Sequence, residues 1–196
     1  MGARNCIYIS AGDHERFASY ALENLAGTYD IVVNHYGSDD KKRRSLSSAM
    51  RLVSYTTTKF ISLKRCYDEL VRGRYDWVAV FDDDAMFTCG SIDDLVDAGE
   101  RHGLDIVSPV HDTSGRVSHR LHLKMEGSHD IRLVNFVEMN FPVFRNSALS
   151  RYMDEYDGKL CGWGNDWWYC NVLETNRRLN AGVLDRVVVE NPNTSG

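Results

Sequence analysis

The sequence predicts an α/β fold in a single domain over residues 1–196, with a mostly parallel central sheet flanked by helices. Short β-rich apolar runs alternate with segments whose apolar residues recur at helical spacing. The first two such runs enclose one helical segment, and this β-α-β order predicts a parallel pair of strands. A chain of 196 residues is also long enough to bury one sizeable core.

The opening β-α-β unit ends at residue 36. Residues 6–10 form the first strand, and Asp13 is placed to cap the N-terminus of the next helix. Gly27 ends this helix, and residues 29–36 form the second strand. The helix is predicted by four apolar residues at helical spacing, Phe17, Tyr20, Ala21 and Leu25.

A polar connection leads from the second strand to the next clear helix. Residues 37–44 read as a loop whose basic run at 41–44 either reaches phosphates or is merely solvated, and we favour the solvated loop. Residues 45–58 are ambiguous between loop and regular structure. A helix with one apolar stripe begins at Lys59 and ends at Gly73.

Three consecutive carboxylates, Asp82, Asp83 and Asp84, follow a buried strand at 78–81. Like charges so close together repel, and a cation relieves that repulsion. Hard oxygen ligands suit Mg²⁺ or Mn²⁺, which also bind phosphate oxygens. Ligands of parallel α/β sheets bind at the C-terminal ends of strands, so the triplet predicts a metal–diphosphate site. The alternative is a solvated acidic turn.

The second half continues the alternation. Ser91 and Asp94 form a capping box for a helix that ends near Gly103. Four histidines between 111 and 130 have irregular spacing, which favours a mobile or substrate-facing loop over a metal site; they are His111, His119, His122 and His129. The remaining predicted elements are a strand at 104–110, a strand-like run at 133–144, a helix from 146 or 147, and a last strand at 181–190.

A glycine-flanked tryptophan precedes the last predicted helix. Gly162 and Gly164 on either side of Trp163 allow a tight turn close to a ligand. Asp166 begins the helix, whose dipole favours an ionised acid there; a helix cap is its alternative role. We expect Trp163 at the site and Trp168 in the core.

Bulk properties narrow the class of protein. A net charge of -5 argues against a nucleic-acid partner. Five cysteines without C-x-x-C spacing argue against a disulfide framework or structural zinc. No run reaches the length of a membrane span and no signal-peptide core is present, so we expect a cytoplasmic protein, in the host cytoplasm if virus-encoded. The loop-like residues 191–196 suit a domain of a longer chain.

An apolar strand that ends in D-x-D, within a β-α-β half, resembles the GT-A class of nucleotide-sugar glycosyltransferases. Further blocks are similar to those of a poorly characterised GT-A-like family found in plants, bacteria and large algal viruses. The likeness covers roughly residues 5–196. Its blocks are residues 59–60, 75–84, 136–148, 162–166 and 182–185.

The resemblance implies a GT-A-like fold and transfer of a sugar from a nucleoside diphosphate sugar, expected to be a UDP-sugar, to a hydroxyl of a glycan or other acceptor. Asp84 matches the aspartate that binds Mn²⁺ or Mg²⁺. Asp82 matches the one that contacts ribose or a metal-bound water, and the role of Asp83 stays open. The implied donor-binding residues are Ser10, Ala11, Gly12, Asp13, Lys59, Asp82, Asp83, Trp163 and Gly164.

On the acceptor side, Asp166 matches the usual general base and Trp163 a platform for a sugar ring. Glu138 is the second candidate base, with pairing to a basic residue as its alternative role. The resemblance does not decide between inversion and retention. GT-A enzymes often add a histidine ligand near the last strand, where this chain has Asn191 or its neighbour Glu190.

Three other functions are alternatives to glycosyl transfer. Nucleotidyltransferases usually carry a glycine-rich basic loop after the first strand, which residues 10–16 lack. Dehalogenase-type phosphatases place D-x-D on the first strand with a threonine soon after, and residues 85–87 do not fit. A non-catalytic nucleotide- or sugar-binding module is supported by the missing histidine.

Overall fold

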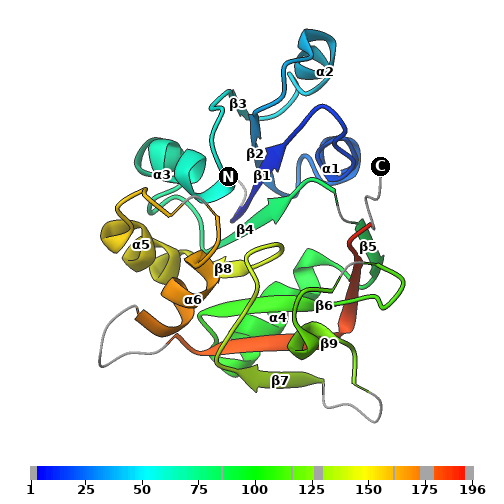
Figure 1. Cartoon of the computed structure of the whole chain (residues 1–196), viewed down its shortest axis with the longest axis vertical. Helices are drawn as coiled ribbons and strands as arrows, with labels where there is room; N and C mark the ends of the chain where they lie inside the picture. The colour runs from blue at the N-terminus through cyan, green and yellow to red at the C-terminus, as the bar shows by residue number, and fades with distance from the viewer. Residues whose placement is uncertain are drawn as a thin grey trace.

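The computed structural model describes residues 4–84, 86–115, 117–125, 130–160, 162–172 and 179–192. Within these residues one mixed sheet of nine strands runs in the order β3-β2-β1-β4-β8-β6-β9-β5, and β7 pairs with β9 (Figure 1). The predicted α/β domain with a central sheet flanked by helices is confirmed. The sheet is mixed, however, where the sequence predicted a mostly parallel one.

The first half of the sheet is parallel. β1 pairs in parallel with both β2 and β4, and β2 with β3, which confirms the predicted β-α-β opening. The elements of this half are β1 (Asn5–Ala11), α1 (Phe17–Asn24), β2 (Asp30–His35), α2 (Asp40–Ser45), β3 (Arg51–Val53), α3 (Lys59–Leu70) and β4 (Trp77–Asp82).

The second half of the sheet breaks the parallel pattern. β8 is antiparallel to both β4 and β6, and β9 is parallel to β6 but antiparallel to β5 and β7. The elements are β5 (Met86–Cys89), α4 (Ile92–His102), β6 (Ile106–His111), η1 (Arg120–His122), β7 (Ile131–Val134), β8 (Val143–Arg145), α5 (Asn146–Glu155), α6 (Asn165–Trp167), η2 (Trp168–Val172) and β9 (Ala181–Glu190).

The run at 133–144 is not one strand as predicted. It divides into the end of β7, an irregular stretch and the start of β8. The irregular stretch still pairs with β4, because the carbonyls of Asn140 and Pro142 accept the N–H groups of Asp82 and Val80. This pairing brings residues 138–142 to the C-terminal end of β4.

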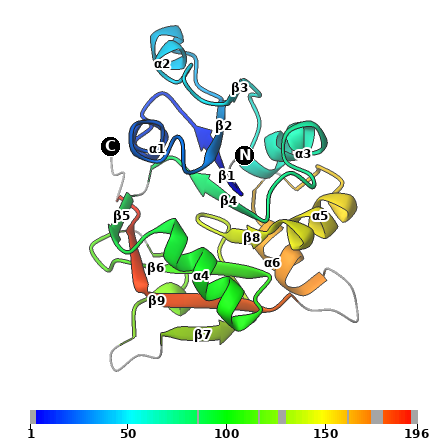
Figure 2. The ribbon, with the colours of Figure 1, turned by 180° about the vertical axis from the view of Figure 1, so that it is seen from behind.

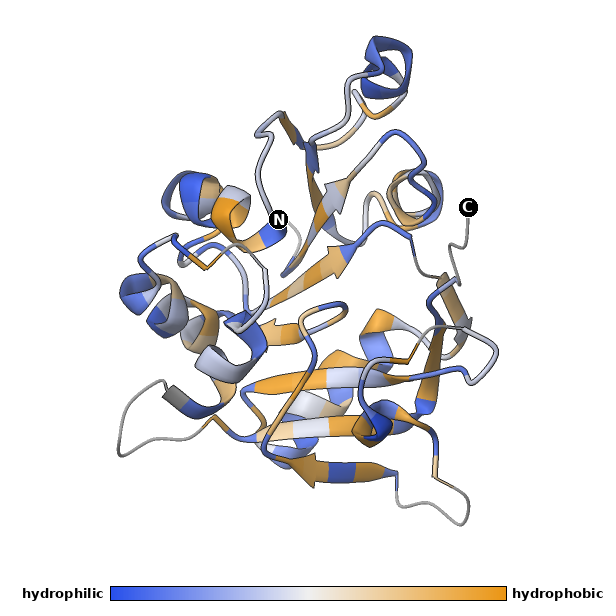
Figure 3. Ribbon diagram, in the orientation of Figure 1, coloured by the Kyte–Doolittle hydropathy of each residue, from blue (hydrophilic) through white to orange (hydrophobic). Residues whose placement is uncertain are grey.

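Helices cover both faces of the sheet, as its alternating side chains require. On β4, Val78 and Val80 pack into the core beneath α3 and α5. Ala79 and Phe81 point to the other face, beneath α1 and α4. Figure 2 shows α4 lying across β6 and β9 on that second face, and Figure 3 shows the strongly apolar central strands.

Two predictions about helix starts are wrong. Asp13 does not cap α1; the main-chain carbonyl of Asp83 accepts the N–H groups of Arg16 and Phe17, each at 2.9 Å. The predicted loop at 37–44 contains α2, because the Asp39 side chain accepts two N–H groups of its first turn. The Ser91 cap of α4 is confirmed, and Gly103 ends that helix in the left-handed conformation.

The cysteines Cys6, Cys66, Cys89 and Cys170 are free, and Cys161 lies outside the described residues. Among the helices of the described ranges, none is both long and apolar enough to span a membrane.

Candidate active site

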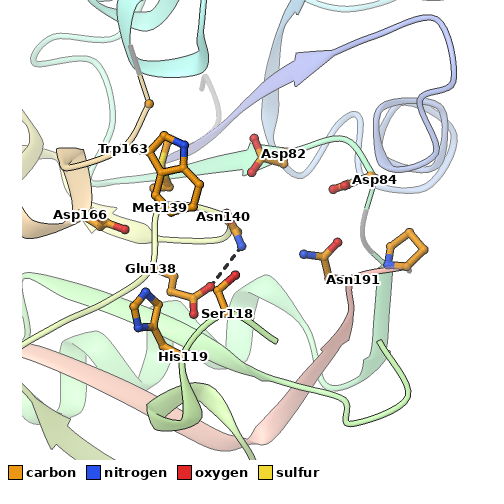
Figure 4. Close-up of a pocket in the computed structure, with 12 residues that line it drawn as sticks. Asp82, Asp84, Ser118, His119, Glu138, Met139, Asn140, Trp163, Asp166 and Asn191 are labelled. Carbon is orange, nitrogen blue, oxygen red and sulfur yellow. Dashed lines mark hydrogen bonds between the residues drawn. The ribbon is translucent and has the colours of Figure 1, made fainter. Parts of the chain in front are cut away.

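A cavity of about 330 Å³ opens at the C-terminal end of β4 (Figure 4). It gathers residues from elements that are far apart in the sequence. Six of them were predicted as site residues: Asp82, Asp84, Glu138, Trp163, Asp166 and Asn191. Gly162 and Pro192 also line it, as do Ser118, His119, Met139 and Asn140.

Lys59, at the start of α3, is a buried cation that joins two walls of this cavity. Its Nζ lies 3.0 Å from Asp82 Oδ1 and donates to the main-chain carbonyls of Asn140, at 3.2 Å, and Met139. Burial lowers the pKa of Lys59, and the charge of Asp82 opposes that effect. Lys59 therefore holds the end of β4 against the 139–140 segment.

Asp83 is not among the residues that line the cavity, and it anchors the neighbouring loop. Its carboxylate accepts the N–H of Gly12, and its carbonyl receives the first N–H groups of α1. Burial raises the pKa of Asp83 to about 6, although the Gly12 N–H opposes the shift. This middle aspartate therefore connects β4 to the loop after β1.

Asp84 and Asn191 supply the oxygen atoms suited to a hard cation. They line the cavity together with Asp82, whereas Glu190 is not among its lining residues. Burial raises the pKa of Asp84 and the charge of Asp82 adds to it, so a bound cation would relieve this repulsion. The described ranges hold no group of three or more His, Cys, Asp or Glu side chains around one point.

The donor set nevertheless fits Mg²⁺ or Mn²⁺. Two carboxylates and an amide oxygen are hard ligands, and Mg²⁺ commonly binds to one or two carboxylates with the rest of its sphere from phosphate and water. An ion held here would therefore depend on a phosphate-bearing ligand for several of its contacts.

A second cavity of about 500 Å³ adjoins the first and shares Asp82, Met139 and Gly162 with it. Among the described residues, the hydroxyls of Thr57 and Thr58 are buried there without a hydrogen-bond partner. Ser10, Tyr36, Thr56, Thr57, Thr58 and Lys59 line the rest of this second cavity.

Of the four predicted donor-binding residues at 10–13, Ser10, which lies in β1, lines the second cavity. The N–H of Gly12 is bonded to Asp83, and Asp13 accepts the N–H groups of Ser38 and Asp39, which lower the pKa of Asp13. Ala11, Gly12 and Asp13 are not among the residues that line either cavity.

Sequence reasoning missed the threonine turn and Tyr36. The available signal was three consecutive hydroxyl side chains, Thr56 to Thr58, directly before a well-defined helix. Such residues are favoured at turns, so the pattern alone indicated a turn rather than a binding wall.

Glu138 and Asp166 are the two carboxylates on the other side of the first cavity (Figure 4). Glu138 is 3% exposed and accepts a hydrogen bond from Asn140 Nδ2 at 3.2 Å. Burial raises its pKa to about 7, and the charge of Asp166 adds to the effect. Asp166 Oδ1 accepts the N–H of Trp167 at 2.9 Å.

The predicted turn around Trp163 is present. Gly162 and Gly164 both have positive φ, at 142° and 93°, and the buried Asn165 donates to the Gly162 carbonyl at 2.8 Å. Trp163 is 84% exposed at the cavity, whereas Trp168 packs partly buried against the core, as predicted.

The histidine-rich stretch divides into two environments. His119 lines the first cavity, as a substrate-facing loop would require. His111 and His122 are instead buried, with their rings in edge contact at 5.7 Å between centroids. The prediction of a mobile or substrate-facing loop is therefore wrong for these two, and His129 lies outside the described residues.

No protein-family model matches the sequence, and no curated protein matches it. Solved structures do match in fold. GalNAc-T7 with UDP, GalNAc and Mn²⁺ superposes with a TM-score of 0.69 at 8% identity, over 97% of this chain and 44% of that one. For S. aureus TarS 1–349 the TM-score is 0.63 at 12% identity, over 94% and 60%.

The chain thus spans about half the length of these two structures. It also matches A197 from STIV, with a TM-score of 0.50 at 11% identity, over 95% of this chain and 84% of that one. TarS and GalNAc-T7 are glycosyltransferases. Identities this low establish shared architecture, not shared chemistry. The chain therefore has a GT-A-like fold.

Proposed function

We propose that this protein is a metal-dependent glycosyltransferase that moves a sugar from a nucleoside diphosphate sugar to a hydroxyl of a glycan or other acceptor. The observation that carries the proposal is the pair of adjoining cavities. One is lined by hydroxyls, and the other by carboxylates and Trp163, and they meet at Asp82. A two-substrate transfer needs this arrangement, with donor and acceptor meeting at one point.

The second cavity is the proposed nucleoside site. Thr57 and Thr58 line it, and their buried, unpaired hydroxyls would bind a ribose or base after a change of side-chain rotamer, while Tyr36 offers an aromatic face. Asp82 stands where the two cavities meet, so it can accept a ribose hydroxyl while Lys59 holds it in place. A UDP-sugar is the expected donor, since the GalNAc-T7 structure contains UDP.

The diphosphate belongs beside Asp84 and Asn191 in the first cavity. Mn²⁺ or Mg²⁺ bound by these two residues would act as a Lewis acid for the leaving diphosphate. Asp82 and Asp84 define its place, and the ion pair with Lys59 holds Asp82 in position. The structure of GalNAc-T7 contains Mn²⁺, which supports this assignment.

The acceptor side is built from Trp163, Asp166 and Glu138. The exposed ring of Trp163 can stack on the apolar face of a sugar. Either carboxylate can take the acceptor proton in a single displacement that inverts the anomeric carbon, and such a base contributes about 10²–10⁴-fold.

A thermal-shift screen of nucleoside diphosphates and their sugars, each with Mn²⁺, tests the proposal. The preferred donor should raise the unfolding temperature by mass action, EDTA should abolish the increase, and Asp84→Asn should weaken it. Transfer to an acceptor panel then follows with that donor. Ligand-induced stabilisation that is the same with and without EDTA would contradict the metal role.

A non-catalytic binding module is the competing function, favoured by Asn191 in place of a histidine and by the absence of a three-residue metal cluster in the described ranges. Calorimetry separates the two functions. Binding of UDP and Mn²⁺ without turnover of any UDP-sugar, to acceptor or to water, would favour the module.

A further inference from the structure

Glu138 has a buried histidine directly behind it. His122, in η1, is fully buried, and its Nδ1 lies 3.7 Å from Glu138 Oε1. Its Nε2 accepts the main-chain N–H of Glu138 at 3.3 Å. In the described ranges neither Nδ1 nor Oε1 has a hydrogen-bond partner. The His122 ring therefore lies next to both the main-chain N–H and the carboxyl group of Glu138.

The contact to the backbone settles the tautomer of His122. Because Nε2 accepts an N–H, it carries no proton, so the proton of the neutral ring is on Nδ1. Burial lowers the pKa of His122 to about 3, and the neighbouring His111, His119 and Arg132 act in the same direction. The ring is thus neutral near pH 7 and presents Nδ1–H toward Glu138 Oε1.

Asn140 links Glu138 to the donor side of the site. Its side chain donates to Glu138 Oε2, and its carbonyl accepts both Lys59 Nζ and the N–H of Asp82. Asp166 has no comparable support among the described residues: its carboxylate accepts the N–H of Trp167, next in the chain. In the view of Figure 4, Asp166 and Trp163 lie on the left of the cavity, Asp84 and Asn191 on the right, and Glu138 between these two groups.

We propose that His122 is a positioning residue for Glu138, and that Glu138 so held takes the proton from the acceptor hydroxyl. This inference rests on the proposed glycosyl transfer. Asp166 then serves to orient the acceptor beside Trp163. The 3.7 Å contact to Nδ1–H is expected to shorten when substrates bind, as catalytic hydrogen bonds often do.

The chemical step balances without a further reactant. The acceptor O–H bond breaks and its proton passes to Glu138. The acceptor oxygen forms a bond to the anomeric carbon, and the bond from that carbon to the diphosphate oxygen breaks. The electron pair of the broken bond leaves with the diphosphate, and the anomeric configuration inverts.

The surroundings of Glu138 suit a group that exchanges a proton near neutral pH. Burial is the largest influence and raises the pKa of Glu138 to about 7. The charge of Asp166 raises it further, while the backbone of His119 lowers it. Nδ1–H of His122 favours the charged carboxylate, so its removal should make Glu138 harder to ionise.

The test measures the titration of Glu138 directly, by carboxyl ¹³C NMR of the free protein. In His122→Phe the midpoint should move to higher pH by about one unit, the size of one hydrogen bond to a charged group. His122→Gln keeps a donor and an acceptor and should restore the midpoint. His102→Phe, an exposed histidine on α4, is the matched control and should leave it unchanged.

The pH profile of sugar transfer is the second arm. Its acid limb should follow the NMR midpoint through the same variants, and Glu138→Gln should lower kcat by about 10²–10⁴-fold. His122→Met replaces the phenylalanine variant if that protein does not fold.

Each arm can overturn the inference separately. An unmoved NMR midpoint in the apolar His122 variants excludes a positioning role, whatever the activity. A midpoint that moves without the acid limb excludes Glu138 as the proton acceptor. If the wild-type protein transfers no sugar from any donor, the proposed function fails, while the NMR arm still decides whether His122 controls Glu138.

Discussion

At the scale of residues, this site depends on charges that are buried together. Lys59 is 4% exposed, and its ammonium contacts Asp82 and two backbone carbonyls. Because it is buried, water cannot take over these contacts if one of them is lost. Glu138 is buried to a similar degree but without a cationic partner at hydrogen-bond distance in the described ranges. Asp82 is thus paired with a buried cation, whereas burial without such a partner raises the pKa of Glu138 to about 7.

Lys59→Met should destabilise the fold by about 2–3 kcal/mol. The variant removes a charged donor from Asp82 and from the carbonyls of Met139 and Asn140, and hydrogen bonds to charged groups contribute about 1.5–3 kcal/mol. Asp82 retains partial solvent contact, which limits the loss. Urea unfolding measures the change, with the exposed Lys41→Met as the control. A loss no larger than that of the control would contradict this role of Lys59.

Glu138→Gln should change how stability depends on pH. The pKa of Glu138 is raised from 4.5 to about 7 in the folded state, so the folded protein binds the proton more tightly than the unfolded chain. This contribution is complete below pH 4.5 and is lost as pH rises through 7. It amounts to about 3 kcal/mol at one unit per 1.36 kcal/mol.

The difference in unfolding free energy between wild type and Glu138→Gln, measured from pH 4 to 8, isolates this group. The curve should fall for wild type relative to the variant as pH rises. Glu23→Gln, an exposed glutamate on α1, should give a flat difference curve. A flat curve for Glu138→Gln as well would show that Glu138 titrates normally.

At the scale of elements, close packing between a helix and a strand holds the fold beneath the site. α4 carries Gly99 where the helix meets the buried indole of Trp77 on β4. A methyl group at Gly99 would lie 2.3 Å from the Trp77 ring. Only glycine therefore allows this approach of α4 to the strand that ends in Asp82.

Gly99→Ala should destabilise the protein despite the higher helix propensity of alanine. Propensity favours alanine by about 1 kcal/mol, but overpacking a rigid buried ring costs about 1–3 kcal/mol or more. Thermal unfolding measures the sum. Asp97→Ala, on the exposed face of the same helix, should be neutral or slightly stabilising. Equal behaviour of the two variants would show that the ring moves aside freely.

At the scale of the whole molecule, the mixed sheet assembles the site. β8 is antiparallel to β4, so the residues that precede β8 lie beside the C-terminal end of β4. Glu138 and Asn140 are such residues. β9 is parallel to β6, and the chain leaves its C-terminal end at Asn191. β8 and β9 run in opposite directions, so the residues that precede β8 and those that follow β9 lie at the same edge of the sheet.

The two cavities should respond separately to substitution. Thr57→Val removes a buried, unpaired hydroxyl, so the free protein should become slightly more stable while the donor KM rises about 3- to 10-fold. Trp163→Ala should raise the acceptor KM and leave the donor KM unchanged. Steady-state kinetics with each substrate varied in turn measures both effects.

Thr28→Val, at an exposed position outside both cavities, is the control for the threonine variant. It should alter neither KM. If Thr57→Val destabilises the free protein, or if Trp163→Ala changes the donor KM alone, the assignment of nucleoside and acceptor to these two cavities is incorrect.

Local sequence patterns were sufficient to predict several features of the fold. The β-α-β opening, the buried strand before Asp82, the cap at Ser91 and the glycine turn around Trp163 depend on periodicity and on short-range backbone preferences. Six of the residues that line the first cavity were also predicted, but some of them, such as Asn191, only through the resemblance to GT-A enzymes.

The contacts between groups that are distant in the sequence could not be predicted from such patterns. The pairing of Lys59 with Asp82, the threonine wall near Ser10, and the placement of His122 behind Glu138 all depend on strand order and direction. Asp83 is an example of what the sequence pattern does not predict. It has the same side chain as Asp82 and Asp84, yet it bonds to Gly12 and does not line the cavity. The alternation of side chains and the path of the chain beyond β4 settle the direction of each carboxylate, and both are properties of the packed sheet rather than of the acidic triplet.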